Sequence, residues 1–216
     1  MEDQATIELS PVNRDGKDER RDAIIAIAKQ AFIEFGYAGT SMSCIASRVG
    51  GSKATLYNYF KSKEELFDAV VGKKCEQFAE LLTAAAIESH GDLRAALTNF
   101  GEHFLEVLLA DDSIAFYRLV IGECSRVPEL GLSIYNAGVR QNQGRMAEFL
   151  TRAKEAGQLR ADADVNVAAE QFTELCLAGI HRRRLWNVVP NPSRKEIQAN
   201  VANAVSTFMR AYGNEA

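Results

Sequence analysis

The chain has 216 residues, of which 47% are hydrophobic, and it carries a formal net charge of -4 at pH 7. This length and composition are sufficient for a buried core in one or two small domains. The slight negative charge excludes a uniformly basic nucleic-acid binder, but it allows a local basic face on an acidic body. No run of about 18 apolar residues occurs, so a membrane-spanning helix is excluded.

The N-terminal segment is polar and contains no apolar core of a secretory signal, so export is not expected. Residues 1–17 are predicted to form a disordered tail. The widely spaced cysteines form no CxxC motif and predict reduced, mostly buried thiols in a cytoplasmic protein. These cysteines are Cys44, Cys75, Cys124 and Cys176.

Helical periodicity begins directly after the tail. One face of the first predicted helix carries apolar residues at i, i+3, i+4 and i+7 spacing: Ile24, Ile27, Ala28, Ala31, Phe32 and Phe35. Gly36 is expected to end this helix. A short helix over about 43–49 follows, and Gly50 and Gly51 then turn the chain. Ser52 is a suitable N-cap for a third helix over about 53–60.

The remaining pattern is helical throughout. Ser62 and Glu65 predict a capping box at the start of a long fourth helix that reaches about residue 88. Ser193 and Glu196 predict a second capping box. Later helices are expected at about 92–108, 112–125, 128–156 with Gly138 as a candidate break, 164–185 and 193–213. The sequence therefore predicts an all-α fold of about nine helices, with an N-terminal three-helix domain and a larger helical C-terminal domain.

The two short helices and their glycine turn have the spacing of a helix-turn-helix over about residues 41–60, whose second helix enters the DNA major groove. No acidic residue occurs between Phe35 and Lys63, whereas this window contains cations, phenols and hydroxyls that suit phosphate oxygens. Leu56 and Phe60 are expected in the core, which directs the opposite face outward. Taken singly, each polar residue also fits an ordinary surface position, so the prediction of DNA binding depends on the joint pattern.

Specific contacts follow from side-chain chemistry. Lys53 can donate to guanine or a phosphate, and Asn58 can read an adenine edge. Ala54 and the methyl group of Thr55 can contact thymine, and Ser43 faces the groove. Further residues are predicted to contact the DNA backbone: Thr40, Tyr57, Tyr59 and Lys63.

Two other classes of protein are alternatives to this interpretation. One is a helical ligand-binding or interaction module that lacks specific DNA binding. The other is an enzyme, but no nucleophile–base pair, metal motif or phosphate loop is visible, so catalysis is not expected. No cofactor is expected, and the cysteine and histidine spacing supports no metal site.

The run from Thr40 to Leu66 contains Thr-Ser-Met, Ile-Ala, a glycine turn, Ser, Thr-Leu-Tyr, Tyr-Phe and Lys-Glu-Glu-Leu. In this order the groups resemble the N-terminal domain of the TetR family of bacterial transcriptional regulators, and the resemblance covers residues 24–70. The later sequence, including RLVIGECSRVPEL, is similar to a TetR subgroup with an AefR-like C-terminal domain. Gly51 stands where the family usually has Val, which is expected to weaken the turn by about 1 kcal/mol. Ala54 stands where the family often has Gly and could alter base preference.

The resemblance implies a DNA-binding domain over residues 18–66 and an effector-binding and dimerisation domain over residues 67–216. It implies a homodimer formed through the last two helices, here 164–186 and 193–213. Their apolar stripes are candidates for this interface or for an ordinary intramolecular core: Phe172, Leu175, Val201, Val205 and Phe208.

The resemblance also implies an effector pocket among the middle helices. The candidate lining residues are amphipathic or aromatic: His103, Phe104, Phe116, Tyr117, Cys124, Tyr135, Cys176, His181 and Trp186. The arginines at 182–184 are expected to form a solvated cluster near a helix end. Together these expectations describe a repressor that a small, largely hydrophobic effector releases from a palindromic double-stranded DNA operator.

Overall fold

Helices dominate residues 14–214, the part of the chain that the computed structural model describes. They are α1 (Arg14–Gly39), α2 (Met42–Val49), α3 (Lys53–Tyr59), α4 (Lys63–Glu88), α5 (Leu93–Leu109), α6 (Asp111–Glu123), α7 (Pro128–Ser133), the π-helix η1 (Ile134–Val139), α8 (Arg140–Glu155), α9 (Val165–Leu177), α10 (Ile180–Leu185) and α11 (Arg194–Tyr212). The predicted all-α fold class is confirmed. Residues 1–13 of the predicted tail lie outside the described residues, and α1 already begins at Arg14.

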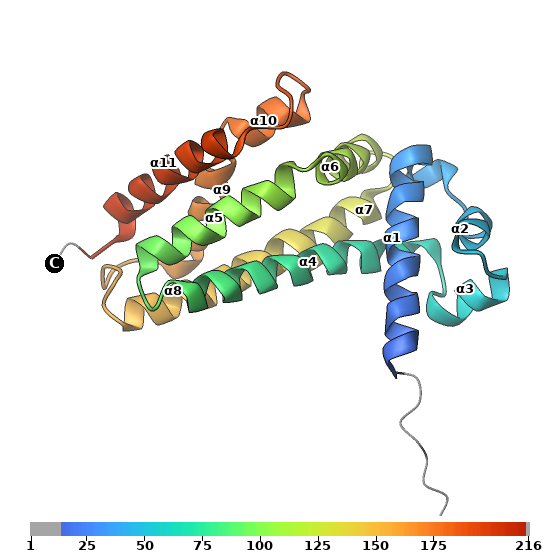
Figure 1. The fold of residues 1–216 in the computed structure, drawn as a ribbon, viewed down its shortest axis with the longest axis horizontal. Helices are drawn as coiled ribbons and strands as arrows, with labels where there is room; N and C mark the ends of the chain where they lie inside the picture. The colour runs from blue at the N-terminus through green and yellow to red at the C-terminus, as the bar shows by residue number, and fades with distance from the viewer. Residues whose placement is uncertain (1–13, 215–216) are drawn as a thin grey trace, which may run out of the picture.

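Helices α1, α2 and α3 form a small head at one end of the molecule, and the remaining helices form an elongated body (Figure 1). The local geometry of the head follows the predicted capping. Gly36 interrupts α1 with a φ of 76°, and Gly50 ends α2 with a φ of 71°. The Ser52 side chain accepts a hydrogen bond from the Thr55 backbone N–H, so it caps α3.

Two hydrophobic cores share α4. The N-terminal part of α4 contributes Phe67 and Val70 to the core of the head, and the middle of the helix contributes Phe78 and Leu82 to the core of the body. The head core also includes Phe116 of α6, whose ring stacks on Phe67 with centroids 5.6 Å apart. The head is therefore packed directly against helices of the body.

Several predicted features of the body differ from the structure. The helix expected over 164–185 is broken at Gly179, which has a φ of 75° and separates α9 from α10. The break expected near Gly138 appears as the π-helical turns of η1. The Ser193–Glu196 capping box is confirmed. Ser62 caps α4 as predicted, but the Glu65 carboxylate accepts from the Lys61 N–H and not from the Ser62 N–H, so the second half of that box is absent.

The apolar stripes of the last helices face inward. Phe172, Val201, Val205 and Phe208 are buried within the single chain, and the rings of Phe172 and Phe208 lie 5.2 Å apart. Leu175 is partly buried against the same core. Of the two alternatives for these stripes, the structure supports the intramolecular core, because these residues complete the core of the body.

Phe35 was expected in the core of the head, but 44% of its surface is exposed. The guanidinium of Arg48 lies over its ring, 4.6 Å from the centroid. Along residues 14–214, no helix combines the length and apolarity that crossing a membrane requires.

The two turn glycines provide a matched test. Gly50→Ala is expected to lower the free energy of unfolding by about 1 kcal/mol, because its left-handed backbone disfavours a Cβ. A Cβ at Gly51 would meet Arg20 and Thr55 at ordinary contact distances of 3.6 and 3.8 Å. Gly51→Ala should therefore stabilise the protein by about 0.5 kcal/mol, because it restricts the unfolded chain. Urea unfolding of both variants checks this, and similar losses at the two positions would contradict it.

Candidate nucleic-acid interface and ligand cavity

Helix α3 presents one polar face to solvent. Leu56 and Phe60 are buried as predicted, whereas Lys53, Ala54 and Asn58 are exposed. Tyr57 is 41% exposed. This arrangement leaves an amine, an amide and a phenol on one short helix, and these are groups that can contact base edges and phosphates.

The cations of the acid-free window differ in their availability. Within residues 14–214, neither Lys53 nor Lys61 has a carboxylate at ion-pairing distance, and both are exposed. Arg48 instead pairs with Glu34 at 2.8 Å. The Lys63 amine donates to the Tyr37 carbonyl at 2.8 Å and lies over the Tyr37 ring, 4.1 Å from its centroid. Lys53 and Lys61 are therefore the unpaired cations of this face.

Hydroxyl groups of the window are also divided between solvent and internal bonds. Ser43 is exposed, and Tyr59 is half-buried against the head core. The Thr55 hydroxyl lies 2.9 Å from the Ser52 hydroxyl, so it already has a partner within the cap. A contact between Thr55 and DNA is therefore expected to use its methyl group.

Thr40 requires a correction. Only 2% of its surface is exposed, and its hydroxyl donates to the carbonyls of Gly36 at 2.7 Å and Ala31 at 3.1 Å. The predicted phosphate contact by this hydroxyl is wrong. Thr40 instead satisfies two carbonyls at the end of α1, where the helix is interrupted.

The end of α1 is joined to the start of α4 by three side chains, those of Tyr37, Lys63 and Glu64. The Tyr37 hydroxyl donates to a Glu64 carboxylate oxygen at 3.1 Å. Burial and then the charge of Glu64 raise the pKa of Tyr37, so the phenol stays protonated and remains a donor. This joint sets the position of the head relative to the long helix of the body.

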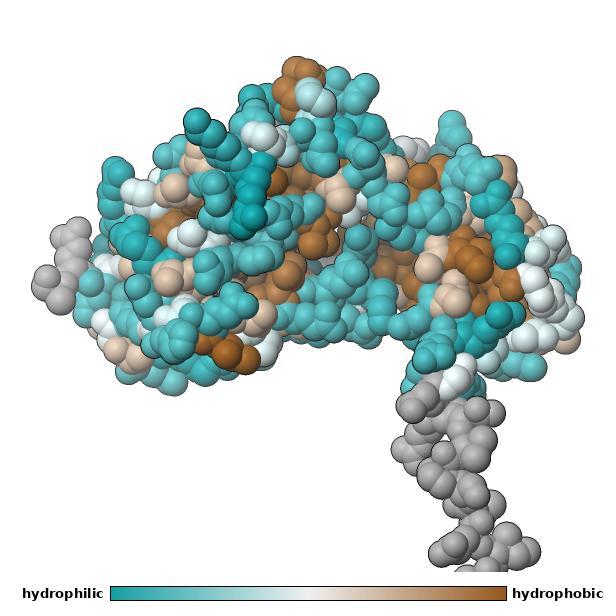
Figure 2. All heavy atoms as spheres, in the orientation of Figure 1, coloured by the Kyte–Doolittle hydropathy of each residue, from teal (hydrophilic) through white to brown (hydrophobic). Residues whose placement is uncertain are grey.

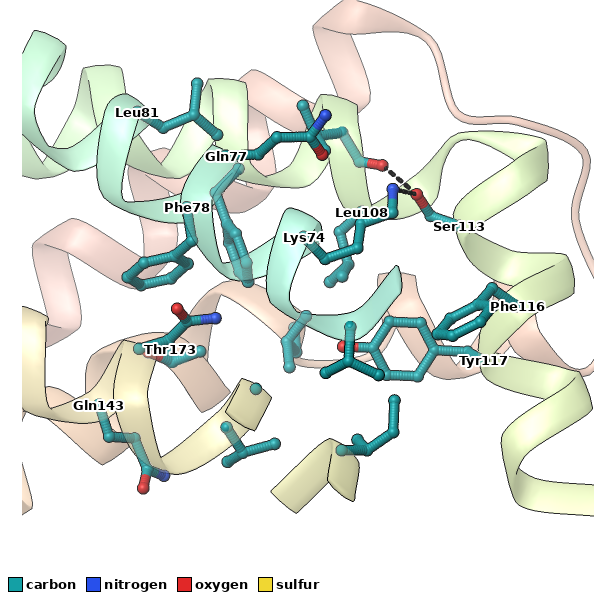
Figure 3. Close-up of a pocket in the computed structure, with 18 of the residues that line it drawn as sticks. Lys74, Gln77, Phe78, Leu81, Leu108, Ser113, Phe116, Tyr117, Gln143 and Thr173 are labelled. Atoms are coloured by element: carbon teal, nitrogen blue, oxygen red, sulfur yellow. Dashed lines mark hydrogen bonds between the residues drawn. The ribbon is translucent and has the colours of Figure 1, made fainter. Parts of the chain in front are cut away.

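The body contains a cavity between α4, α5, α6, η1, α8 and α9, with about 1050 Å³ of space that protein atoms do not fill and that is partly open to solvent. Figure 3 shows Phe78, Leu81, Phe116 and Tyr117 on its walls. Three predicted lining residues, Phe104, Phe116 and Tyr117, do line it. The walls are largely apolar, which suits a hydrophobic small molecule.

The other predicted pocket residues lie elsewhere. Trp186 is 71% exposed, Tyr135 is also exposed, and the His103 ring bonds to the Asn99 carbonyl on the outside of α5. Cys176 is buried in the body core, where burial raises the pKa of its thiol to about 12. Two further positions complete the set: Cys124 is half-buried outside the cavity, and the His181 ring packs against the cavity residue Tyr117, with ring centroids 5.4 Å apart.

Polar lining residues were missed by the sequence analysis. Lys74 lies on the same face of α4 as Val71, three residues before it, and Phe78, four residues after it. The signal available in the sequence for Lys74 was the presence of a lysine on an apolar helix face. Other polar lining residues come from several helices: Gln77, Ser113, Asn142, Gln143, Thr173 and Glu174.

The predicted arginine cluster is only partly solvated. Arg184 is 6% exposed and pairs with Asp111 at the start of α6. Arg118 of α6 donates to the carbonyls of Arg184 and Leu185, each at 2.8 Å. These bonds fasten α10 to α6. The loop that follows α10 carries the exposed Val188, and hydrophobic residues are visible at its tip in Figure 2.

Comparison with known families agrees with this geometry. Residues 24–70 match the family model of bacterial regulatory proteins, tetR family, and residues 95–214 match that of the AefR-like transcriptional repressor, C-terminal domain. The chain belongs to the TetR family of bacterial regulatory proteins, and its C-terminal domain is of the AefR-like type.

Two curated relatives match only part of this chain. The HTH-type transcriptional activator FasR of Mycolicibacterium smegmatis is 35% identical over 91 residues, which are 41% of this chain and 42% of FasR. The uncharacterized regulator YhgD of Bacillus subtilis is 33% identical over 82 residues, 37% of this chain and 43% of YhgD. The chain thus aligns with less than half the length of these relatives.

Solved structures match over nearly the whole chain. A TetR-family regulator from Mesorhizobium loti has a TM-score of 0.79 and 26% identity, covering 93% of this chain and 99% of that one. The flavonoid-responsive regulator FrrA has a TM-score of 0.72 and 30% identity, covering 92% of this chain and 100% of FrrA.

The role assigned to Thr40 can be tested by substitution. Thr40→Val should lower the free energy of unfolding by about 1–3 kcal/mol, because the carbonyls of Ala31 and Gly36 lose the hydroxyl hydrogen that they share. Thr40→Ser keeps the hydroxyl and should cost less than about 1 kcal/mol. Thermal unfolding measures both effects. A Thr40→Val variant with unchanged stability but weaker DNA binding would contradict this role and indicate that the hydroxyl contacts DNA.

Proposed function

We propose that the chain is a sequence-specific DNA-binding transcriptional regulator, a repressor that leaves a near-palindromic operator when a small, largely hydrophobic effector occupies the cavity. In this proposal, residues 18–66 form the DNA-binding domain, and residues 67–216 bind the effector and dimerise. The observation that carries the proposal is the carboxylate-free face of α3, with Lys53 and Asn58 exposed on it.

The proposed docking places α3 in the major groove. Asn58 would read an adenine edge, Lys53 a guanine or a phosphate, and Ala54 or Thr55 a thymine methyl group. Tyr57, Tyr59 and Ser43 would contact the backbone or the groove wall. Lys63 is a secondary candidate for a contact with the DNA backbone, because its amine already donates to the Tyr37 carbonyl at the end of α1.

A homodimer would present two heads about one turn of DNA apart, which makes a near-palindromic operator the expected target. The segments 164–186 and 193–213 are the proposed pairing elements. Because their apolar stripes are turned into the body core, pairing would use the outward faces, where Val167 and Ala202 are exposed. Such a dimer is proposed to act in the cytoplasm, on the bacterial chromosome.

Contacts between α6 and α1 support a route from the cavity to the head. Phe116 and Tyr117 of α6 line the cavity, and Asp112 at its start accepts from Lys29 at 3.1 Å and Gln30 at 2.9 Å on α1. A ligand that displaced α6 would therefore move α1 and change the spacing of the two heads. Effector and DNA affinities would be coupled reciprocally, by about 1–3 kcal/mol.

Selection of retained sequences from random double-stranded DNA tests the proposal directly. A shared near-palindrome is expected for a dimeric, sequence-specific regulator. Retention without a shared motif, lost at moderate salt, would instead favour the helical ligand-binding or interaction module, whose DNA attraction is non-specific.

Substitutions on α3 should separate base reading from phosphate contact. Asn58→Ala is expected to relax preference at one operator position by about 1–3 kcal/mol, because a bidentate base contact is lost. Lys61→Ala should weaken binding to all sequences alike and reduce the salt slope by about 1. Titrations of operator variants at several salt concentrations measure both. The exposed Arg94 of α5 lies outside the DNA-binding domain and the proposed pairing segments, and Arg94→Ala is a control that should leave both quantities unchanged. An Asn58→Ala variant with unaltered base preference would contradict the assigned docking.

A further inference from the structure

We infer that the cavity takes an amphipathic anion, a molecule with a largely apolar body and one negatively charged group received by Lys74. This inference rests on the proposed function, because it specifies the chemistry of the effector. Three features of the cavity carry it: an unpaired cation, an excess of positive charge around that cation, and an apolar remainder.

The amine of Lys74 has a neutral partner. It donates to the Ser113 hydroxyl at 2.9 Å, and that hydroxyl in turn donates to the Val107 carbonyl at 2.7 Å (Figure 3). Within residues 14–214, no carboxylate lies within ion-pairing distance of the Lys74 amine. A lysine amine carries three donor hydrogens, so this contact leaves donors available for a ligand.

Burial makes this unpaired charge costly. Burial, followed by repulsion from Lys29, lowers the pKa of Lys74, while the charge of Asp112 acts in the opposite direction. Asp112 is itself bonded to Lys29 and Gln30 on α1. The carboxylate of Asp112 is therefore already paired with Lys29, and it acts on Lys74 only from beyond ion-pairing distance. A bound anion would supply the missing negative charge.

The other polar lining groups define the orientation. Glu174 lies on the α9 wall, and its carboxylate disfavours an anion there, so the charged end is directed toward α4 and α6. The buried side-chain oxygen of Asn142 has no hydrogen-bond partner within the described residues. It can accept from a hydroxyl or N–H of the ligand.

The body of the ligand meets aromatic walls. Phe78 and Phe104 line the cavity with their ring centroids 5.7 Å apart, and both rings pack on Phe100 behind them. Leu81 and Leu108 extend this apolar surface. A planar or flexible apolar group fits these walls better than a highly charged one.

A matched pair of fluorescent probes tests the inference without DNA. The sulfonate 1-anilinonaphthalene-8-sulfonate and the neutral N-phenyl-1-naphthylamine share one aromatic body and differ by a single negative charge. Their fluorescence is titrated against the full chain and against Lys74→Met, which removes the charge and keeps the length of the side chain. Circular dichroism verifies that the variant is folded.

Lys74→Met is expected to weaken binding of the sulfonate by about tenfold, the loss of one charge-assisted hydrogen bond, and to change binding of the neutral probe by less than about twofold. Lys73→Met serves as the matched control, because the neighbouring Lys73 pairs with Asp22 and Glu76 outside the cavity. It should leave the affinities of both probes unchanged.

Equal losses for both probes in Lys74→Met, or no binding of the sulfonate to the wild-type chain, would overturn the inference. Neither result depends on DNA binding by the head. A chain that selects an operator but shows no charge preference in its cavity would keep the proposed DNA binding and lose this inference. Charge-selective probe binding by a chain that selects no operator would support this inference and contradict the proposed DNA binding.

Discussion

Helix α4 contributes to two hydrophobic cores at different points along one apolar face, and the coupling between the head and the cavity depends on this constraint. Its first turns complete the core of the head through Phe67 and Val70, and its middle supplies Phe78 to the core of the body and to the cavity wall. Because packed cores resist small displacements, a shift of this helix at the cavity cannot be absorbed locally. The stacked rings of Phe67 and Phe116 extend the same constraint to α6.

Internal bonding decides which charges remain available for partners. Arg48 and Lys63 belong to the acid-free window, yet their side chains bond to α1 and hold the head together. Lys53 is left unpaired on the outer face of α3, and Lys74 is left with only a hydroxyl partner at the cavity. Of these four cations, two therefore keep their charge available at separate places, Lys53 for phosphates and Lys74 for a small anion.

The accuracy of the sequence-based expectations followed the range of the interactions involved. Helix caps such as Ser52 and the left-handed Gly50 depend on neighbours a few residues away, and these were predicted correctly. Several residues whose partners are distant in sequence were misplaced. Arg184 was expected in solvent but is buried against Asp111, and Trp186 was expected in the cavity but is exposed. Periodicity indicates that a face is apolar, but it does not identify what covers that face.

Sequence alone determined the all-α class, the order of most helices and the candidate reading face, because periodicity, caps and the absence of acids are local properties of the chain. Only the tertiary structure decided that Phe208 and its stripe complete an internal core, that Thr40 is buried, and that Lys74 enters the cavity. Those outcomes depend on how α4, α6, α9 and α11 pack together. Burial and charge pairing between segments distant in sequence are properties of that packing, and a single helix pattern does not contain them.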